Sequence, residues 1–142
     1  GILGSLSRTQ DVATHIDAIL GALTPGVTGA PRGMYGSPDN AGVGLFFTKS
    51  IAKASHEYFA VVSGDAAYRL RRVRTREHFR LFFDPRHDRH DMYTDLPVWN
   101  GTVVAVDIGI RRMRSFEGTM AAIREAITPE KQKGKGPKVK FV

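Results

Sequence analysis

The sequence contains no cysteine, which excludes disulfide bonds and thiolate metal sites from the 142-residue chain. The lack of cysteine also fits a reducing compartment, so we expect a cytoplasmic location. No apolar run approaches the roughly 20 residues that a membrane-spanning helix needs. The first residues lack a basic segment followed by a continuous apolar stretch, so we expect no signal peptide.

Acidic residues are the scarcer charged class. The chain has 14 Asp and Glu against 21 Lys and Arg, which gives a formal net charge of +7. A basic excess favours anionic partners such as nucleotides, nucleic acid or acidic membranes, without choosing among them. The proportion of hydrophobic residues, 42%, suits one compact domain with its own core.

Hydrophobic periodicity predicts three helices. In the second of them, Phe47, Ile51 and Ala54 share the apolar face, whereas Lys49 and Lys53 point elsewhere. The predicted helices cover residues 11–23, 45–55 and 115–127.

Three further segments read as strands. Residues 57–63 are apolar on both faces, which is typical of a strand buried in a sheet. A Ser-Gly-Asp turn follows, and residues 66–73 form the return strand of a hairpin. Residues 102–110 alternate between two faces, which predicts a third strand.

The remaining segments are predicted loops. Residues 25–40 are rich in Gly and Pro, residues 84–96 are polar and exposed, and residues 129–142 form a flexible basic tail. Helices packed on one face of a mostly antiparallel sheet give a two-layer α/β sandwich, which is the fold class we expect.

A glycine-rich turn opens the second predicted helix. Gly42 and Gly44 permit positive φ and a close approach of the backbone to a ligand. The free N–H groups and partial positive charge of a helix start suit phosphate. The alternative is a glycine-rich turn without a ligand. No strand immediately precedes the glycines, as a dinucleotide fold requires, and no Gly-Lys-Ser/Thr follows, as a P-loop requires.

Together with its flanks, this turn resembles the second glycine box of the GHKL ATPases (gyrase, histidine kinase and related proteins). In that family a Gly-x-Gly-Leu turn opens a helix, and a hairpin and a strand beginning Gly-Thr follow. Here these are Gly42–Leu45, the 57–73 hairpin and Gly101-Thr102. The start, Gly1-Ile2-Leu3-Gly4, resembles the end of the family's first glycine box. The helix at 11–23 and the loop at 25–40 match the family's helix and nucleotide lid.

The resemblance implies an incomplete Bergerat-like domain over residues 1–128 that binds ATP with Mg²⁺. Backbone N–H groups of Gly42, Gly44 and Leu45 would hold the phosphates. Thr102 would help to hold the adenine end, unless it is only a β-branched strand residue. The lid residues that would lie near the γ-phosphate are Thr28, Gly29 and Arg32.

The same resemblance places several family residues before Gly1. They are the Asp of the first glycine box, the Asn that helps to bind Mg²⁺ and, in some members, a catalytic Glu. The chain therefore resembles the C-terminal portion of the domain. The family includes both kinases and ATPases, and the residues that decide between them are not in this sequence. We expect no protein-ligated metal site within the chain.

The alternative function is a nucleic-acid-binding or protein-interaction module. It would use the lysine-rich tail and a mid-chain arginine cluster, which is otherwise a solvated strand edge. A His/Asp-rich run at 84–91 has metal-ligand residue types, but interleaved arginines favour a solvated loop. The arginine cluster consists of Arg69, Arg71, Arg72, Arg74 and Arg76.

The expected absence of an N-terminal helix has a consequence for the sheet. The face that carries Val104, Val106, Ile108 and Ile110 would be incompletely covered. Such a face calls for a partner chain, unless the helix at 115–127 covers it.

Overall fold

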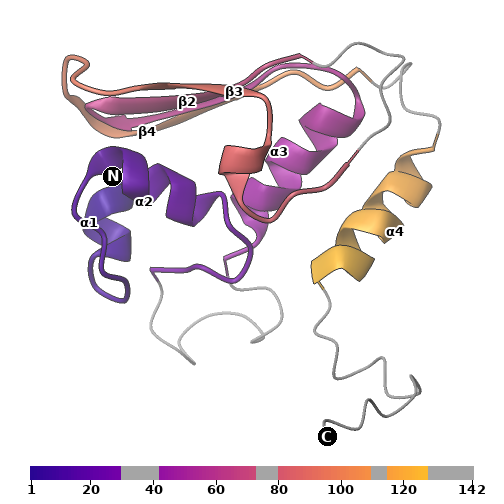
Figure 1. The fold of residues 1–142 in the computed structure, drawn as a ribbon, viewed down its shortest axis with the longest axis horizontal. Coiled ribbons are helices and arrows are strands. Elements are labelled where there is room, and N and C mark those ends of the chain that lie inside the picture. Colours follow the sequence, from indigo (N-terminus) through magenta and orange to yellow (C-terminus); the bar gives the residue numbers. More distant parts are fainter. Residues whose placement is uncertain (30–41, 73–79, 110–114, 128–142) are drawn as a thin grey trace, which may run out of the picture.

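The computed structural model describes residues 1–29, 42–72, 80–109 and 115–127. Within these ranges the fold is mixed α/β, with a four-stranded antiparallel sheet in the order β3-β2-β1-β4. Helices α1, α2 and α3 lie on one face of this sheet, so the described part of the chain has a helix layer and a sheet layer (Figure 1). The mixed α/β class and the antiparallel sheet are confirmed.

The central hairpin forms where the sequence predicted it. Strand β1 (Phe59–Gly64) pairs with β2 (Ala66–Leu70), and the turn between them places Gly64 at φ +62°. An added Cβ on Gly64 would lie 2.2 Å from the ring of His15, so the turn also requires glycine for space. The ring of His15 is held beside the turn, with its Nδ1 2.8 Å from Asp65 Oδ1.

Strand β4 (Trp99–Val106) pairs with the other side of β1. It begins and ends earlier than the predicted 102–110 strand. The predicted alternation is confirmed where it is described, because Val104 and Val106 pair with the buried Val61 and Phe59. Residue 110 lies outside the described residues. Trp99, the first residue of β4, is 55% exposed.

Two helices precede the hairpin. The first, α1 (Ile2–Leu6), has only five residues and was not predicted. The second, α2 (His15–Ala22), starts later than the predicted residue 11, because Thr14 is its N-cap. The Thr14 hydroxyl accepts a hydrogen bond from the backbone N–H of Asp17 at 3.2 Å.

Helix α3 (Gly44–Ala54) starts at the glycine-rich turn, as predicted, but it buries a different face. Its buried residues are Phe46, Lys49, Ser50 and Ala52, so the prediction that Lys49 points away from the core is wrong. The reason is a buried anion: Asp88 accepts hydrogen bonds from the ammonium groups of Lys49 and Lys53.

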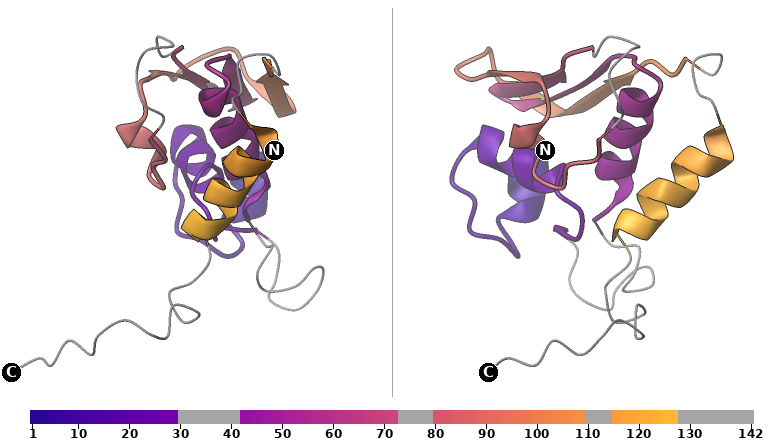
Figure 2. Two further views of the ribbon diagram at one scale, coloured as in Figure 1. Left: turned by 90° about the vertical axis from the view of Figure 1, so that its right-hand side faces the viewer. Right: turned by 45° about the vertical axis from the view of Figure 1, so that its right-hand side comes forward.

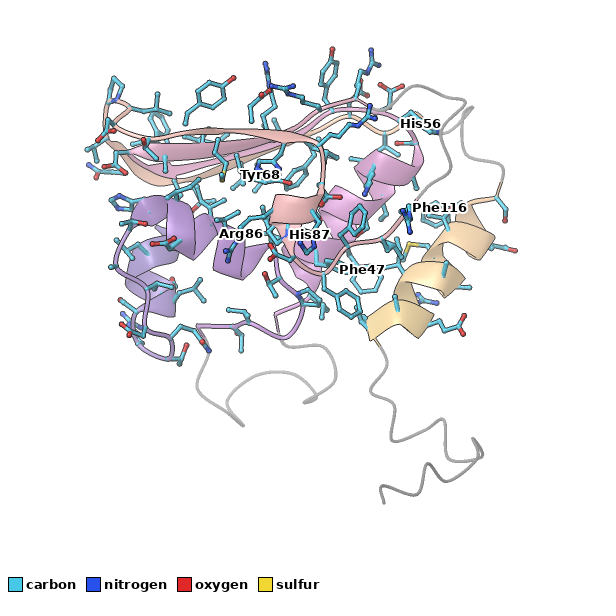
Figure 3. All side chains as sticks on the ribbon, viewed as in Figure 1. Phe47, His56, Tyr68, Arg86, His87 and Phe116 are labelled. Carbon is cyan, nitrogen blue, oxygen red and sulfur yellow. The ribbon has the colours of Figure 1, made fainter. Side chains whose placement is uncertain are left out.

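The segment predicted as an exposed polar loop at 84–96 contains regular structure instead. A 3-10 helix, η1 (Pro85–His87), is followed by β3 (His90–Tyr93), which pairs with β2. Pro85 is buried, and its carbonyl oxygen accepts a hydrogen bond from the buried Tyr68 hydroxyl at 2.9 Å. Figure 3 shows Tyr68 on the helix-facing side of the sheet.

The core lies between the sheet and α2 and α3. It includes Phe59 and Val61 from β1, Leu70 from β2, and Ile19 and Leu23 from α2, all at most 1% exposed. Each buried side chain of this size contributes about 1.5–3 kcal/mol to folding.

Helix α4 (Phe116–Ile127) packs against α3, on the side away from α1 and α2 (Figures 1 and 2). It buries Ile123 but leaves Phe116 55% exposed. It does not close the sheet face beneath β4, since Val104, Val106 and Ile108 remain 41%, 42% and 43% exposed. The incompletely covered sheet face predicted from the sequence is therefore present in the described residues. Residues 129–142 lie outside them.

Candidate functional site

An open cavity of about 450 Å³ lies between the helix layer and one end of the sheet. Four segments that are distant in sequence form its wall: α1, the chain after α2, the start of α3, and the start of β4. Its lining residues are Gly1, Ile2, Ser5, Leu6, Ala22, Val27, Thr28, Gly29, Gly42, Gly44, Leu45, Gly101 and Thr102.

The cavity brings together most of the residues that the sequence predicted for a binding site. Six of the predicted residues are among its lining residues, and the seventh, Arg32, lies outside the described residues. Ligand pockets commonly have volumes of about 300–1,000 Å³, so the cavity is large enough for a small molecule. The six predicted residues in the lining are Thr28, Gly29, Gly42, Gly44, Leu45 and Thr102.

The N-terminus of α3 opens onto this cavity. Its N-cap residue, Val43, makes no side-chain capping hydrogen bond, and the first turn contains no acidic residue. The first N–H groups of a helix have no intrahelical acceptor, and they carry the positive end of the helix dipole. Gly44 is exposed, and an added Cβ there would meet no atom within 4 Å. This helix end therefore offers uncrowded donors to an anion.

Two other glycines shape the wall by close backbone contacts. Gly42 has φ +77°, and a Cβ there would lie 2.3 Å from the carbonyl oxygen of Val27. A Cβ on Gly29 would lie 2.4 Å from the carbonyl oxygen of Ser5. A residue with a side chain at either position would collide with the facing backbone and push the two segments apart. These two glycines thus hold the segments around the cavity together.

Ser63 connects two parts of the wall, α1 and the start of β4. Its hydroxyl accepts a hydrogen bond from the N–H of Ile2 at 3.1 Å and can donate to the carbonyl oxygen of Gly101 at 3.1 Å. The Thr102 hydroxyl lies 3.2 Å from the same oxygen. Ser63 is only 1% exposed. Sequence reasoning placed it in a turn and missed this role, because no local pattern shows which distant segments a buried serine will join.

The described residues around the cavity do not form a protein-ligated magnesium site. Among its described lining residues, none is an Asp, Glu, Asn or Gln, although Mg²⁺ in proteins is usually bound through one or two carboxylates. Among the described residues of the whole chain, no three His, Asp or Glu side chains gather as metal ligands would.

The His/Asp-rich run is divided among separate partners. Asp84 caps η1 by accepting a hydrogen bond from the N–H of Arg86 at 2.9 Å, and Asp88 binds the two lysines of α3. Asp91 forms ion pairs with Arg69, which lies in β2, and with Arg71, which follows β2. These carboxylates are committed to ion pairs and a helix cap.

The arginine cluster lies partly against carboxylates. Arg69 and Arg71 both donate to Asp91, and Arg72 donates to Glu57. The hydrogen bonds from Arg71, foremost, and from Arg69 lower the pKa of Asp91 from 3.8 to about 2. The three described arginines and their two acidic partners carry a net charge of only +1. The remaining arginines, at 74 and 76, lie outside the described residues.

Burial disfavours the charged form of the Lys49 side chain. The loss of water around its ammonium group lowers the pKa of Lys49, although the neighbouring Asp88 opposes that shift. Lys49 is 1% exposed and does not line the cavity, so its ion pair belongs to the core rather than to a ligand site.

No helix among the described residues is long and apolar enough to cross a membrane. Comparison of the chain with protein-family models, with curated proteins and with solved structures finds no match.

Proposed function

We propose that this chain binds ATP in the cavity between α1, α3 and β4, as a GHKL-type nucleotide-binding module. One observation carries the proposal: residues that the glycine-box resemblance selected from the sequence line a single cavity, although they come from distant segments. The resemblance rests on sequence motifs alone, whereas the cavity is a feature of the fold. Their agreement is an independent support for a nucleotide site.

In this proposal the phosphates lie at the start of α3. The N–H groups of the first turn of α3 face an anion there, and Gly44 leaves room for an oxygen to approach the backbone. Thr28 and Gly29 form the neighbouring wall, at the position expected for the base of the lid. Charge-assisted hydrogen bonds of this kind are shorter and stronger than neutral ones.

The base of the nucleotide lies toward β4. Thr102 lines the cavity there, and its hydroxyl is held near Ser63. Ile2 and Leu45 add apolar surface to the wall, which suits the faces of a purine. We propose binding and not turnover, because the described cavity residues include no carboxylate to act as a general base or to hold the metal.

The proposal predicts that Gly44→Val greatly weakens ATP binding while the fold is retained. The valine side chain would occupy the approach to the helix N-terminus, and Gly44 has space around it in the folded chain. Loss of one or two charge-assisted hydrogen bonds, at about 1.5–3 kcal/mol each, corresponds to at least a tenfold loss of affinity. Calorimetric titration with a non-hydrolysable ATP analogue measures this affinity.

The matched control is Ile51→Val, two turns along α3 and outside the cavity lining. It introduces the same side chain into the same helix, so it should leave the affinity unchanged. Equal affinity in Gly44→Val and the unsubstituted chain would refute the phosphate position. No heat of binding from the unsubstituted chain would refute the proposed function itself.

A further inference from the structure

The side chain of Ser63, near the end of β1, is the meeting point of three polar groups at the wall of the cavity. The N–H of Ile2 donates to its hydroxyl oxygen at 3.1 Å. The carbonyl oxygen of Gly101 lies 3.1 Å from the same hydroxyl, and the hydroxyl of Thr102 lies 3.2 Å from it. Since Ser63 is buried, these three groups rather than bulk water decide where its proton lies.

An irregularity in β4 brings the carbonyl group to this position. Ser63 pairs with Thr102, but the next residue of β1 pairs with Trp99, so the register passes over Gly101 and the residue before it. Gly101 has φ +138°, a backbone conformation that glycine adopts and other residues rarely do. Bulges of this kind bend a strand and change the direction of its groups, and they are common beside functional sites. Here the bulge directs the carbonyl oxygen of Gly101 at the Ser63 hydroxyl.

The direction of each hydrogen bond follows from the single proton of a serine hydroxyl. A carbonyl oxygen can only accept, so Ser63 donates its proton to Gly101. Its two lone pairs then accept from the N–H of Ile2 and from the hydroxyl of Thr102, which is therefore the donor in that contact. The opposite direction would leave the carbonyl oxygen and a serine lone pair 3.1 Å apart with no proton between them.

We propose that Ser63 is a positioning residue that fixes the Thr102 hydroxyl as a hydrogen-bond acceptor toward the cavity, and thereby sets which base the nucleotide site prefers. Thr102 lines the cavity and is exposed, and its hydroxyl has no second hydrogen-bond partner in the part of the chain that the structure describes. With its proton held by Ser63, that oxygen can only accept from a ligand. The inference rests on the proposed function, because it concerns the base of a nucleotide in the same cavity.

A hydroxyl that only accepts favours a base whose facing group donates. The 6-amino group of adenine donates, whereas the 6-oxo group of hypoxanthine accepts, and the two purines have the same ring skeleton. Two acceptors cannot form a hydrogen bond, and a site that hydrogen-bonds one ligand group discriminates against an analogue that cannot pair with it. The cavity should therefore bind ATP more tightly than ITP, by about tenfold for one such hydrogen bond.

The test is the ratio of the dissociation constants for ITP and ATP, measured by calorimetric titration of the full chain. The unsubstituted chain should prefer ATP about tenfold. In Ser63→Ala the proton of Thr102 is free to turn toward the ligand, so the two nucleotides should bind with similar affinity. Ser55→Ala is the matched control, because the Ser55 hydroxyl is also buried and also donates to a backbone carbonyl oxygen, that of Ala52 at 3.1 Å, outside the cavity lining. It should keep the preference for ATP.

Thr102→Val keeps the test decisive if Ser63→Ala does not fold. Thr102 is exposed, and valine suits a strand, so this variant removes the acceptor without altering the core, and it should also lose the preference.

The possible failures are distinguishable. ATP binding without a preference over ITP in the unsubstituted chain would overturn the inference and leave the proposed function intact. A preference that persists in Ser63→Ala or Thr102→Val, or that is lost in Ser55→Ala, would do the same. Binding of neither nucleotide to the unsubstituted chain would refute the proposed function, and this inference with it.

Discussion

Three glycines at the cavity differ in what the surrounding atoms permit. Gly42 has a positive φ and is in close contact with the backbone at Val27, whereas Gly44 starts a helix in open space. Gly29 lies equally close to the backbone, at the carbonyl oxygen of Ser5, but its φ is not positive. The sequence motif does not distinguish Gly42 from Gly44. The fold does, because Gly42 is required by the backbone geometry, whereas Gly44 leaves space for a ligand.

This difference predicts opposite effects on stability. Gly42→Ala should destabilise the chain by about 1–3 kcal/mol, because its Cβ must adopt positive φ and displace the carbonyl of Val27. Gly44→Ala should be neutral or stabilising by up to about 1 kcal/mol, since alanine is favoured over glycine in a helix. Denaturant unfolding measures both. Equal free energies of unfolding in the two variants would contradict this division of roles.

Asp91 gives the chain a predicted acid sensitivity. Its pKa is lowered from 3.8 to about 2 by Arg71 and Arg69. A carboxyl with a depressed pKa in the folded state stabilises the fold above its unfolded pKa, and that stability is lost as the pH falls through the folded pKa. The contribution of Asp91 should therefore be complete at neutral pH and decline between about pH 4 and pH 2.

Asp91→Asn should flatten this part of the curve of unfolding free energy against pH. Asp11→Asn, which removes an exposed carboxylate outside the arginine pairs, should keep the acid-dependent slope of the unsubstituted chain. Thermal unfolding across the acid range compares the three proteins. An Asp91→Asn curve that follows the unsubstituted chain at every pH would show that the arginine pairs contribute nothing to stability.

At the scale of elements, a buried ion cluster joins α3 to the η1–β3 segment. Asp88 is 4% exposed and accepts hydrogen bonds from Lys49 and Lys53, and Lys53 also donates to the carbonyl oxygen of Arg80. Removing one member of such a cluster destabilises the fold, because the remaining buried charge then has neither an ionic partner nor water around it. The cluster therefore fixes the position of η1 against the helix.

Asp88→Ala should destabilise the chain by about 3–5 kcal/mol, because it leaves Lys49 buried without an anion. Asp84→Ala, which removes the cap of η1 and a solvent-exposed ion pair with Arg86, should cost about 1 kcal/mol. Chemical denaturation gives both values. If the two substitutions cost the same, the lysine–aspartate cluster does not hold η1 in place as described.

The elements that the sequence predicted are those with a strong local pattern. The hairpin of β1 and β2 has two apolar strands and a glycine turn, so its position could be predicted closely. Strand β3 was missed because it has only four residues and lies in a polar segment, where Asp91 pairs with arginines at the edge of the sheet. The buried face of α3 was misassigned because only tertiary structure reveals that Asp88 lies opposite Lys49.

At the scale of the whole molecule, the candidate site was predictable only in part. The motif order predicted Gly42, Gly44 and Thr102, and these residues line the same cavity in the fold. Ser63 and the contact between Gly29 and Ser5 could not be predicted, because each depends on segments that meet only after folding. Short motifs mark where a backbone can approach a ligand, whereas the wall around it is a property of the fold.

The uncovered side of β4 was also expected at this scale. The family resemblance predicted an incompletely covered sheet face at Val104, Val106 and Ile108, and these residues are exposed. Helix α4 packs against α3 and leaves this stripe open. The cavity and the open edge meet at Gly101 and Thr102, which begin β4 and line the cavity.

The most direct test of the nucleotide site is to locate binding residue by residue with amide NMR spectra of the full chain during titration with ATP. The largest shifts should fall on the N–H groups of Gly42, Gly44, Leu45 and Thr102, and they should persist at moderate salt, because the site is a cavity and not an exposed basic patch. Absence of shifts at these amides, or shifts confined to the Arg69–Arg72 surface that vanish with added salt, would contradict the account.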